Sequence, residues 1–356
     1  KSATNASAKC FMSKEEESWL WHRRLAHVNM KNIRKLVNKG LVRGLPSIKY
    51  QKTKLCDACQ KGKQTKAPHK GKSAVSTTTA LDLLHMDLFD CSSVISLNGS
   101  RYCLVIIDDF TRYTWTFFLK TKDQTIDIFI SFCRRTENEK STTIKTIRSD
   151  HGGEFQNHRF LEFCQEKGYR HEFSTPRTPQ QNGVVERKNR VLQEAARSML
   201  NEYSLPSYLW AEAVNTACYV QNRILIHRFL GKTPHELWFG KPPTIKHLRV
   251  FGCKVFILNT KDHLGKFSAK ADEGILVGYS LTSKAYRVYN NRTKLIEESS
   301  DVAFEEIPNL NDQSRDVGEI QFELRRLSLN DRNIERVEVD SDDDEQRQQR
   351  TQSDPL

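Results

Sequence analysis

Residues 81–89, "LDLLHMDLF", begin a series of three apolar segments that sets the fold class of the chain. The next two are "RYCLVIIDDFTR" at 101–112 and "YTWTFFLKT" at 113–121. All three are short runs of apolar, β-branched and aromatic residues separated by turn residues, a pattern that predicts three consecutive β-strands. Asp87 lies inside the first of them, where a lone carboxylate is costly to desolvate and needs a compensating cation.

Helical and strand-like patterns alternate after these segments. The alternation predicts one α/β domain, residues 75–242, built on a mixed five-stranded sheet. Gly168 is expected to end the second of the helices. The patterns are helical at 124–139, strand-like at 144–150, helical at 157–168, strand-like at 169–175, and helical at 184–203 and 206–226.

Smaller parts flank this domain on both sides. Upstream, residues 19–42 have a helical pattern and lead into "CDACQKGKQTKAPHKGK" (56–72), so we expect a small helical domain over 1–72. Downstream, the strand-like segments "HLRVFGCKVFIL" (247–258), "EGILVGYS" (273–280) and "AYRVYN" (285–290) predict a small β-barrel over 247–306. From 308 to 356 the chain is polar and charged and includes "DSDDDEQRQQR", so we expect a disordered acidic tail there.

The charge of the chain is positive and unevenly distributed. The 356 residues carry a net charge of +12; residues 1–72 have 18 Lys and Arg against 4 Asp and Glu, whereas residues 301–356 have 7 against 16. A basic excess on a folded body indicates a polyanionic partner, most often nucleic acid, with a generic surface bias as the alternative. The nine cysteines, an odd number and mostly scattered, suit a reducing compartment rather than a disulfide framework.

No apolar stretch has the length that a membrane requires. None reaches the roughly 18–20 apolar residues of a span, and the N-terminal region lacks the apolar core of a signal peptide, so we expect no membrane partner. Because the chain begins with Lys1 rather than Met, we expect it to be a segment of a longer polypeptide. Its function is then expected to depend on neighbouring modules.

Four side chains in the N-terminal part are candidate metal ligands. His22, His27, Cys56 and Cys59 offer two nitrogens and two sulfurs, the set that structural zinc prefers, and a bound ion would stabilise a domain with few apolar residues. The alternative is a core histidine with two free thiols. Residues five apart on a straight helix point about 140° away from each other, so the chain must leave helical geometry between the two histidines.

Three carboxylates in the α/β domain are candidate ligands of a second kind. Asp87 lies in a predicted strand, Asp150 ends another, and Glu186 lies early in a predicted helix; 62 residues separate the first pair and 35 the second. Taken alone, Glu186 is an ordinary acid that pairs with Arg190 one turn later. Together, the three acids can converge at one sheet edge, where magnesium would relieve their repulsion and serve an in-line phosphodiester displacement.

Basic residues accompany both sets of candidate ligands. On the helix predicted at 184–203, Glu186 lies opposite an apolar stripe formed by Val185, Leu192, Ala196 and Met199. The run of lysines after the cysteines, residues 61–72, also fits a nuclear-localisation signal or a solvated linker. The acidic tail fits a spacer, with DNA mimicry or partner binding as its alternative. The residues expected to bind a nucleic-acid backbone are Arg187, Lys188, Arg190, Arg197, Lys61, Lys63 and Lys66.

Eight segments of the chain form a combination found in one known family. They are "WHRRLAH", "CDACQKGKQTKAP", "IDDFTRYTWTFFLKTK", "RSDHGGEF", "TPQQNGVVERKNR", "LWAEAV", "KTPHELWFGKPP" and "HLRVFGC". Together they resemble the integrase segment of copia-type long-terminal-repeat retrotransposon polyproteins. The resemblance covers roughly residues 19–306 and includes the order of the His/His/Cys/Cys set and of the Asp, Asp, 35-residue spacer and Glu.

This resemblance implies a fold, an activity and partners. It implies a ribonuclease-H-like core in which Asp87, Asp150 and Glu186 are the catalytic triad, with Asp87 bridging two metal ions and each other acid completing one shell. It implies a Src-homology-three-like barrel over 247–306, Mg²⁺ or Mn²⁺ and Zn²⁺ as cofactors, and an enzyme that processes DNA 3′ ends and joins them to target DNA. It also implies at least a dimer, neighbouring polyprotein modules as partners, and a nuclear location with a cytoplasmic particle stage.

Two positions depart from the pattern of the family. His151 stands where the family commonly has Asn, and "DLFDCSS" lacks the Gly-Pro that often follows the first Asp. They keep open an inactive or domesticated nucleic-acid-binding scaffold as an alternative function. A ribonuclease of the same general fold is another alternative, although the 35-residue spacing and the "TPQQNG" loop favour the integrase arrangement.

Overall fold

The computed structural model describes residues 14–63, 77–91, 93–174, 182–259 and 266–306. The expected acidic tail at 308–356, Lys66 and most of the "TPQQNG" loop lie outside the described residues. Apart from 204–206, the described residues form one compact unit. Among the helices of this described part, none combines the length and the apolar character that crossing a bilayer requires.

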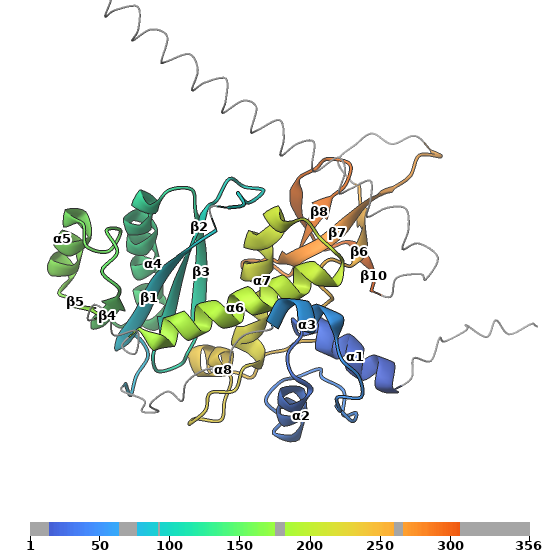
Figure 1. Ribbon diagram of the computed structural model, residues 1–356, viewed down its shortest axis with the longest axis horizontal. Helices are drawn as coiled ribbons and strands as arrows, with labels where there is room; N and C mark the ends of the chain where they lie inside the picture. Colours follow the sequence, from blue (N-terminus) through green and yellow to red (C-terminus); the bar gives the residue numbers. More distant parts are fainter. Residues whose placement is uncertain (1–13, 64–76, 92, 175–181, 260–265, 307–356) are drawn as a thin grey trace, which may run out of the picture. The chain divides into compact units, whose positions relative to one another are not determined.

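The central layer is a mixed five-stranded sheet, as the sequence predicts. Its strand order is β3-β2-β1-β4-β5 (Figure 1). Strand β2 is antiparallel to its neighbours β1 and β3, and β4 and β5 are parallel to β1. The strands are β1 (Leu83–Asp90), β2 (Tyr102–Asp108), β3 (Thr114–Leu119), β4 (Thr146–Ser149) and β5 (Arg170–Phe173). The helices of this domain are α4 (Thr125–Lys140), α5 (His158–Lys167), α6 (Gly183–Glu202), α7 (Trp210–Ile224) and α8 (Pro234–Phe239).

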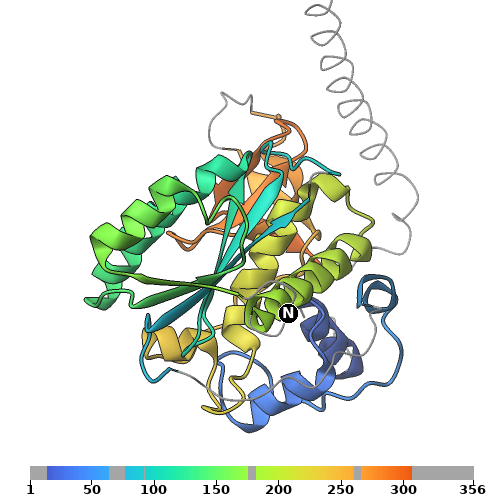
Figure 2. The same cartoon turned by 60° about the vertical axis from the view of Figure 1, so that its left-hand side comes forward.

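Helices cover both faces of this sheet (Figure 2). On one face, Leu84 and Met86 of β1 are fully buried with aromatic rings of α4 and α5, among them Phe129 and Phe160, whose centroids lie 5.0 Å apart. Side chains alternate along a strand, so Asp87 points to the opposite face. Helix α6 contacts β1 and β2 on this second face, and α7 contacts β3. The sheet therefore presents Asp87 toward the helix that carries Glu186.

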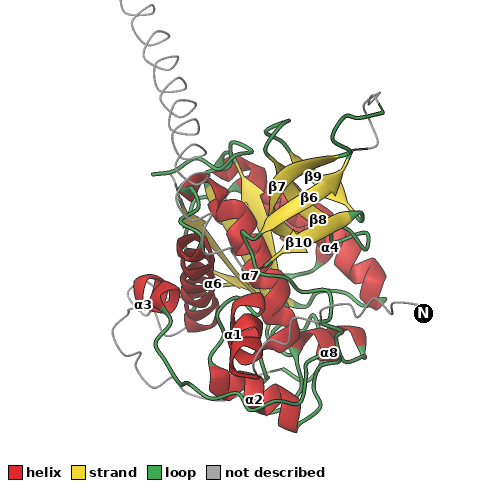
Figure 3. Ribbon diagram, turned by 90° about the vertical axis from the view of Figure 1, so that its right-hand side faces the viewer, coloured by secondary structure: helices red, strands yellow, loops and turns green. Residues whose placement is uncertain are grey.

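A second, antiparallel five-stranded sheet follows α8 (Figure 3). Its order is β10-β6-β7-β8-β9, and its core contains Val255, Ile257, Leu276 and Val288. The sequence patterns anticipate β6, β7 and β8, whereas β9 and β10 were not predicted. The strands are β6 (Lys254–Leu258), β7 (Ala271–Tyr279), β8 (Tyr286–Asn290), β9 (Ile296–Ser299) and β10 (Val302–Glu305).

Three short helices form the N-terminal part. Leu25, Ile33 and Leu36 are fully buried, and Asn29 caps the second helix by accepting a hydrogen bond from the Lys31 amide. The third helix packs on α6. The helices are α1 (Lys14–Arg24), α2 (Met30–Asn38) and α3 (Asp57–Lys63).

Candidate metal centres and nucleic-acid interface

The chain reverses sharply between the two candidate histidine ligands. Helix α1 ends at Arg24, and Ala26 and His27 then adopt left-handed backbone conformations, with φ of 52° and 58°. The His27 amide donates to the carbonyl oxygen of His22 at 2.9 Å, which closes the turn. The departure from helical geometry turns both imidazoles toward the cysteines at the start of α3.

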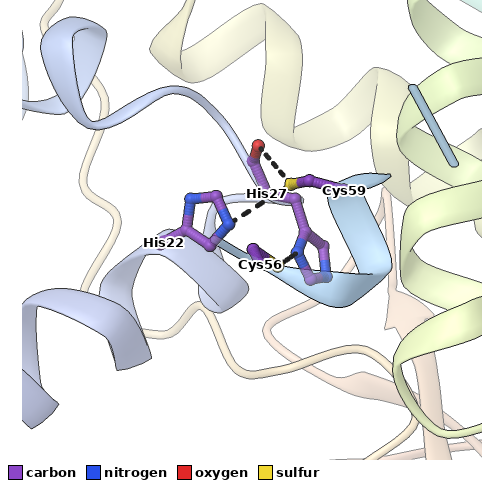
Figure 4. Close-up of side chains that lie close together, drawn as sticks. All are labelled: His22, His27, Cys56 and Cys59. Carbon is purple, nitrogen blue, oxygen red and sulfur yellow. Dashed lines mark hydrogen bonds between the residues drawn. The ribbon is translucent and has the colours of Figure 1, made fainter. Parts of the chain in front are cut away.

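The four side chains form a compact group, which we call the His/Cys cluster (His22, His27, Cys56, Cys59; Figure 4). Their ligand atoms all lie within 4.8 Å of one another; His22 Nε2 is 3.4 Å from Cys59 Sγ, and His27 Nδ1 is 3.5 Å from Cys56 Sγ. Metal bonds of about 2.0–2.3 Å in a tetrahedron place ligand atoms about 3.3–3.8 Å apart. The cluster therefore fits a tetrahedral divalent metal ion.

The surroundings of the cluster favour the ligand forms of His22 and Cys56. His22 Nδ1 lies 2.8 Å from the carbonyl oxygen of Val28, to which it donates when Nε2 is the ligand atom. The hydrogen bond from Cys59 lowers the pKa of the Cys56 thiol, and contacts with both histidines lower it further against the effect of burial. The thiolate form of Cys56 is thus favoured before a cation is considered, whereas the hydrogen bond to Cys56 and burial raise the pKa of the Cys59 thiol.

Strand pairing places two of the three candidate carboxylates next to each other. β1 pairs in parallel with β4, and His85 is opposite Arg148. Two residues further along both strands, the same register sets Asp87 beside Asp150, which follows the end of β4. The Asp150 carboxylate accepts a hydrogen bond from the Gly152 amide at 3.1 Å, which orients it at this sheet edge.

Asp87 is the most perturbed of these acids. Burial, together with the negative charges of Asp150 and Glu186, raises its pKa to about 6. Its carboxylate accepts hydrogen bonds from Asn189 Nδ2 at 2.7 Å and from the Leu88 amide at 3.0 Å. Asp87 therefore lies near enough to Asp150 and Glu186 for their charges to raise its pKa. We call these three acids the carboxylate trio (Asp87, Asp150, Glu186).

The third acid extends from the first turn of α6. Val185, Leu192, Ala196 and Met199 are buried, as the predicted apolar stripe requires, and Glu186 is exposed. Among the described residues, the oxygen atoms of the trio do not form a group as compact as the ligand atoms of the His/Cys cluster. Carboxylates repel one another, so a looser arrangement follows from their charge.

The expected DNA-binding residues divide into two classes. Arg187, Arg190, Arg197 and Lys61 are exposed, whereas Lys66 lies outside the described part of the chain. Lys188 differs from our expectation, because it flanks the buried stripe of α6 three residues after Val185. Burial lowers the pKa of its ammonium group to about 8.

Lys63 is also half-buried and has a hydrogen-bond partner within the protein. Its Nζ donates to the carbonyl oxygen of His27 at 2.6 Å, and burial lowers its pKa. Both lysines are half-buried, so a phosphate contact by Lys63 or Lys188 stays a prediction. In each case the lysine was expected on the surface from its position in a charged run, and tertiary packing covers part of its side chain.

Three features of the site were not anticipated from sequence. Asn189 is the side-chain partner of Asp87, and the helical spacing of three residues from Glu186 was its available signal. His85 and Asp109 form a buried pair, with Nε2 2.9 Å from Oδ1, one alternation upstream of Asp87. His151, at the position where the family commonly has Asn, is exposed and stacks on Phe173 with centroids 5.0 Å apart.

Profiles of three protein families match the chain in succession. Residues 1–64 match the GAG-pre-integrase domain, residues 78–179 the integrase core domain, and residues 253–317 the retroviral polymerase SH3-like domain. Among solved structures, the catalytic core domain of HTLV-2 integrase in complex with magnesium is 20% identical with a TM-score of 0.33, covering 44% of this chain and 94% of that one. A simian T-cell lymphotropic virus intasome in complex with a PP2A regulatory subunit is 16% identical with a TM-score of 0.39, covering 71% and 88%.

Longer relatives match most of the chain at higher identity. The retrovirus-related Pol polyprotein from transposon TNT 1-94 of Nicotiana tabacum is 37% identical over 81% of this chain and 21% of its own length. Those from transposons RE2 and RE1 of Arabidopsis thaliana are 32% and 33% identical, each over 80% of this chain and 19% of their own length. The chain thus spans about a fifth of these relatives. With matches to the GAG-pre-integrase, integrase core and SH3-like domains in this order, the chain is homologous to a segment of copia-type retrotransposon Pol polyproteins.

Proposed function

We propose that the chain is an integrase that trims DNA 3′ ends and joins them to target DNA. In the first step a water molecule attacks a phosphodiester near the 3′ terminus, and in the second the freed 3′ hydroxyl attacks a target strand. The observation that carries this proposal is Asp87, whose pKa rises to about 6 through burial and through the charges of Asp150 and Glu186. Such a perturbed acid with specific charged neighbours is typical of a catalytic site.

The carboxylate trio would hold two Mg²⁺ or Mn²⁺ ions. Its oxygen donors suit such hard cations, and the repulsion felt by Asp87 is what a cation relieves. When bound, the ions would supply activation of the attacking oxygen and neutralisation of charge on the departing one. Within the chain, Asn189 and the Leu88 amide orient Asp87, and the Gly152 amide orients Asp150.

The His/Cys cluster would bind Zn²⁺ as a structural ion. Two nitrogens and two thiolates in tetrahedral spacing are the ligands that zinc selects over magnesium. The ion would hold together α1, the turn at His27 and α3, which together bury few apolar side chains.

DNA is the proposed partner, held by the exposed arginines of α6. Arg187, Arg190 and Arg197 are available to phosphates on the helix that carries Glu186. Joining two DNA ends to one target requires two active sites, so we propose at least a dimer. We further propose that neighbouring modules of the polyprotein cooperate with it and that it acts in the nucleus after a cytoplasmic particle stage.

A strand-transfer assay tests the proposal. With magnesium and an oligonucleotide that mimics an element end, the wild-type chain is expected to join DNA, and Glu186→Gln to lose about 10³-fold or more of this activity. Glu162→Gln is the matched control, because that exposed glutamate of α5 pairs with His158 on the surface. Equal joining by the wild type and Glu186→Gln would eliminate the trio, and binding without joining by both would leave a nucleic-acid-binding scaffold.

A further inference from the structure

Each imidazole of the His/Cys cluster directs one ring nitrogen to a sulfur and the other to an outer partner. In His22 the inner atom is Nε2, near Cys59, and the outer nitrogen faces a backbone carbonyl. In His27 the order is reversed: Nδ1 is 3.5 Å from Cys56 Sγ, and Nε2 is 3.0 Å from Oε2 of Glu202. A hydrogen bond to the outer nitrogen sets the tautomer and the orientation of a metal-binding imidazole.

The outer partner of His27 comes from the helix that carries Glu186. Glu202 is the last residue of α6, and its side chain is 15% exposed against 1% for His27, so water competes little for the contact. The other carboxylate oxygen forms an ion pair with Arg23 Nε at 2.5 Å. Glu202 is therefore held as a charged acceptor that faces the cluster.

A second contact seats the cluster against the same helix. A Cβ atom on Gly62 of α3 would lie 2.4 Å from Ser198 Oγ and 2.8 Å from the Ser198 backbone nitrogen, so α3 approaches α6 at a distance that excludes a larger residue. Both ribbon views show α3 beside α6 (Figures 1 and 3). Cys59 lies on α3, so two of the four side chains of the His/Cys cluster, His27 and Cys59, are positioned by contacts with α6.

We propose that Glu202 is a positioning residue that orients His27 for the metal ion of the His/Cys cluster. Metal binding thereby fixes the C-terminal end of α6, the helix that carries Glu186. The inference rests on the proposed zinc binding and goes beyond it, since Glu202 lies outside all three matched segments, 1–64, 78–179 and 253–317. Sixteen helical steps separate Glu186 from Glu202, about 24 Å of continuous helix. Zinc binding and the placement of Glu186 are then properties of one rigid element.

Zinc affinity of the full chain, measured by competition with a colorimetric chelator, tests this role. Glu202→Ala is expected to weaken zinc binding about 10- to 100-fold, and Glu202→Gln, which keeps a neutral acceptor, to weaken it less. Hydrogen exchange is the second readout: zinc should slow exchange in the last turns of α6 in the wild type and not in Glu202→Ala. Asn201→Ala is the matched control, an exposed neighbour whose side chain donates to the Arg197 carbonyl oxygen.

A third variant separates positioning from simple structural support. Arg23→Ala removes the ion pair of Glu202 but leaves its contact with His27, so thermal stability should fall while zinc affinity stays within about threefold of the wild type. The proposal is overturned if Arg23→Ala weakens zinc as much as Glu202→Ala does, or if both Glu202 variants bind zinc like the wild type. If the wild type binds no zinc, the proposed zinc site itself fails.

Discussion

The His/Cys cluster and the carboxylate trio are both candidate metal centres, yet the structure closes one and leaves the other open. The cluster has all its ligand atoms within 4.8 Å, and both of its imidazoles have outer partners. In the trio, Asp87 and Asp150 are neighbours across paired strands, while Glu186 remains exposed at the start of α6. The two regions thus differ in how closely the polypeptide alone brings the candidate ligand atoms together.

Charge explains this difference. Thiols and imidazoles are neutral or can share protons, so they hydrogen-bond to one another and approach ligand spacing without a cation. Three carboxylates can only accept hydrogen bonds, and each approach raises the cost of ionising the next, as the pKa of Asp87 at about 6 records. The fold alone therefore closes the His/Cys cluster, whereas the carboxylate trio would be completed by the ions that we propose for it.

Removing the metal from the cluster should produce the largest effect. Zinc-dependent stabilisation of small domains reaches roughly 10 kcal/mol, and the N-terminal helices bury few apolar side chains, so a zinc chelator is expected to unfold residues 14–63. Hydrogen exchange should then become fast in α1–α3, whereas β1 and β2 stay protected by the aromatic core under the sheet. Unchanged protection in α1–α3 after chelation would refute the metal-dependent fold.

Neutralising the central acid of the trio should separate activity from stability. Asp87→Asn is expected to reduce strand transfer by about 10³-fold, near 4 kcal/mol in activation free energy. The folded pKa of about 6 lies above the ordinary value of 3.8, so ionised Asp87 costs stability as pH rises through this window. In buffer with zinc but no magnesium at pH 7.5, the variant should therefore melt no lower than the wild type.

The same pair of measurements on Asp90→Asn, at the exposed end of β1, provides the control. That variant should keep its activity, because Asp90 lies beyond the trio. A clear drop in the melting temperature of Asp87→Asn would contradict the view that the trio is a source of repulsion in the metal-free fold. The cluster behaves oppositely, since loss of a ligand there should lower stability.

The parts of the fold that sequence predicted are those governed by local pattern. The alternation in "LDLLHMDLF" places Asp87 on one face of β1 and Leu84 and Met86 on the other, and the mixed sheet follows from the order of its segments. Strands β9 and β10 were missed because each has only four residues, and three of the four in β9 are charged or polar. Helix α8 was missed because it has six residues and begins with Pro234.

The parts that sequence could not supply depend on contacts between distant residues. Ligand types and spacing indicated both candidate centres, but the pairing of Asn189 with Asp87 spans 102 positions of the chain. Glu202 was invisible as a partner of His27 for the same reason, since the signal exists when α6 and the N-terminal turn meet in space. The partial burial of Lys188 and Lys63 was likewise not predictable, because charge patterns do not report which side of a helix packs against the rest of the protein.

Truncating the partner of Asp87 should have a moderate effect. Asn189→Ala removes the 2.7 Å hydrogen bond that orients the Asp87 carboxylate. Strand transfer is therefore expected to fall about 10-fold, which is about 1.4 kcal/mol of activation free energy, and the required magnesium concentration to rise. Asn189→Asp should be more damaging, because a further negative charge would face Asp87. Gln193→Ala, one turn later on α6, is the control. A magnesium dependence that does not change in Asn189→Ala would show that the trio is oriented without this residue.

The last expected effect, similar in size to that of Asn189→Ala, is a loss of stability in acid. It must be measured before the two centres are compared at low pH. Burial, reinforced by Arg223 and Arg249, lowers the pKa of His247 to about 4, and its Nε2 lies 2.9 Å from the Tyr219 hydroxyl. In the unfolded chain the pKa is near 6.5, so the unfolded state binds more protons between these values, and stability present above pH 6.5 is lost as pH falls toward 4. After allowance for partial exposure, the loss should be about 1–2 kcal/mol.

Urea unfolding of the wild type and of His247→Gln at pH 7.0 and 4.5, with saturating zinc, measures this contribution. Any effect of acid on the His/Cys cluster or on the trio is common to both proteins and cancels in the difference between them. The variant should therefore lose about 1–2 kcal/mol less than the wild type on acidification. Equal losses would mean that His247 does not titrate in this range on unfolding, and the whole acid sensitivity would then belong to the metal centres.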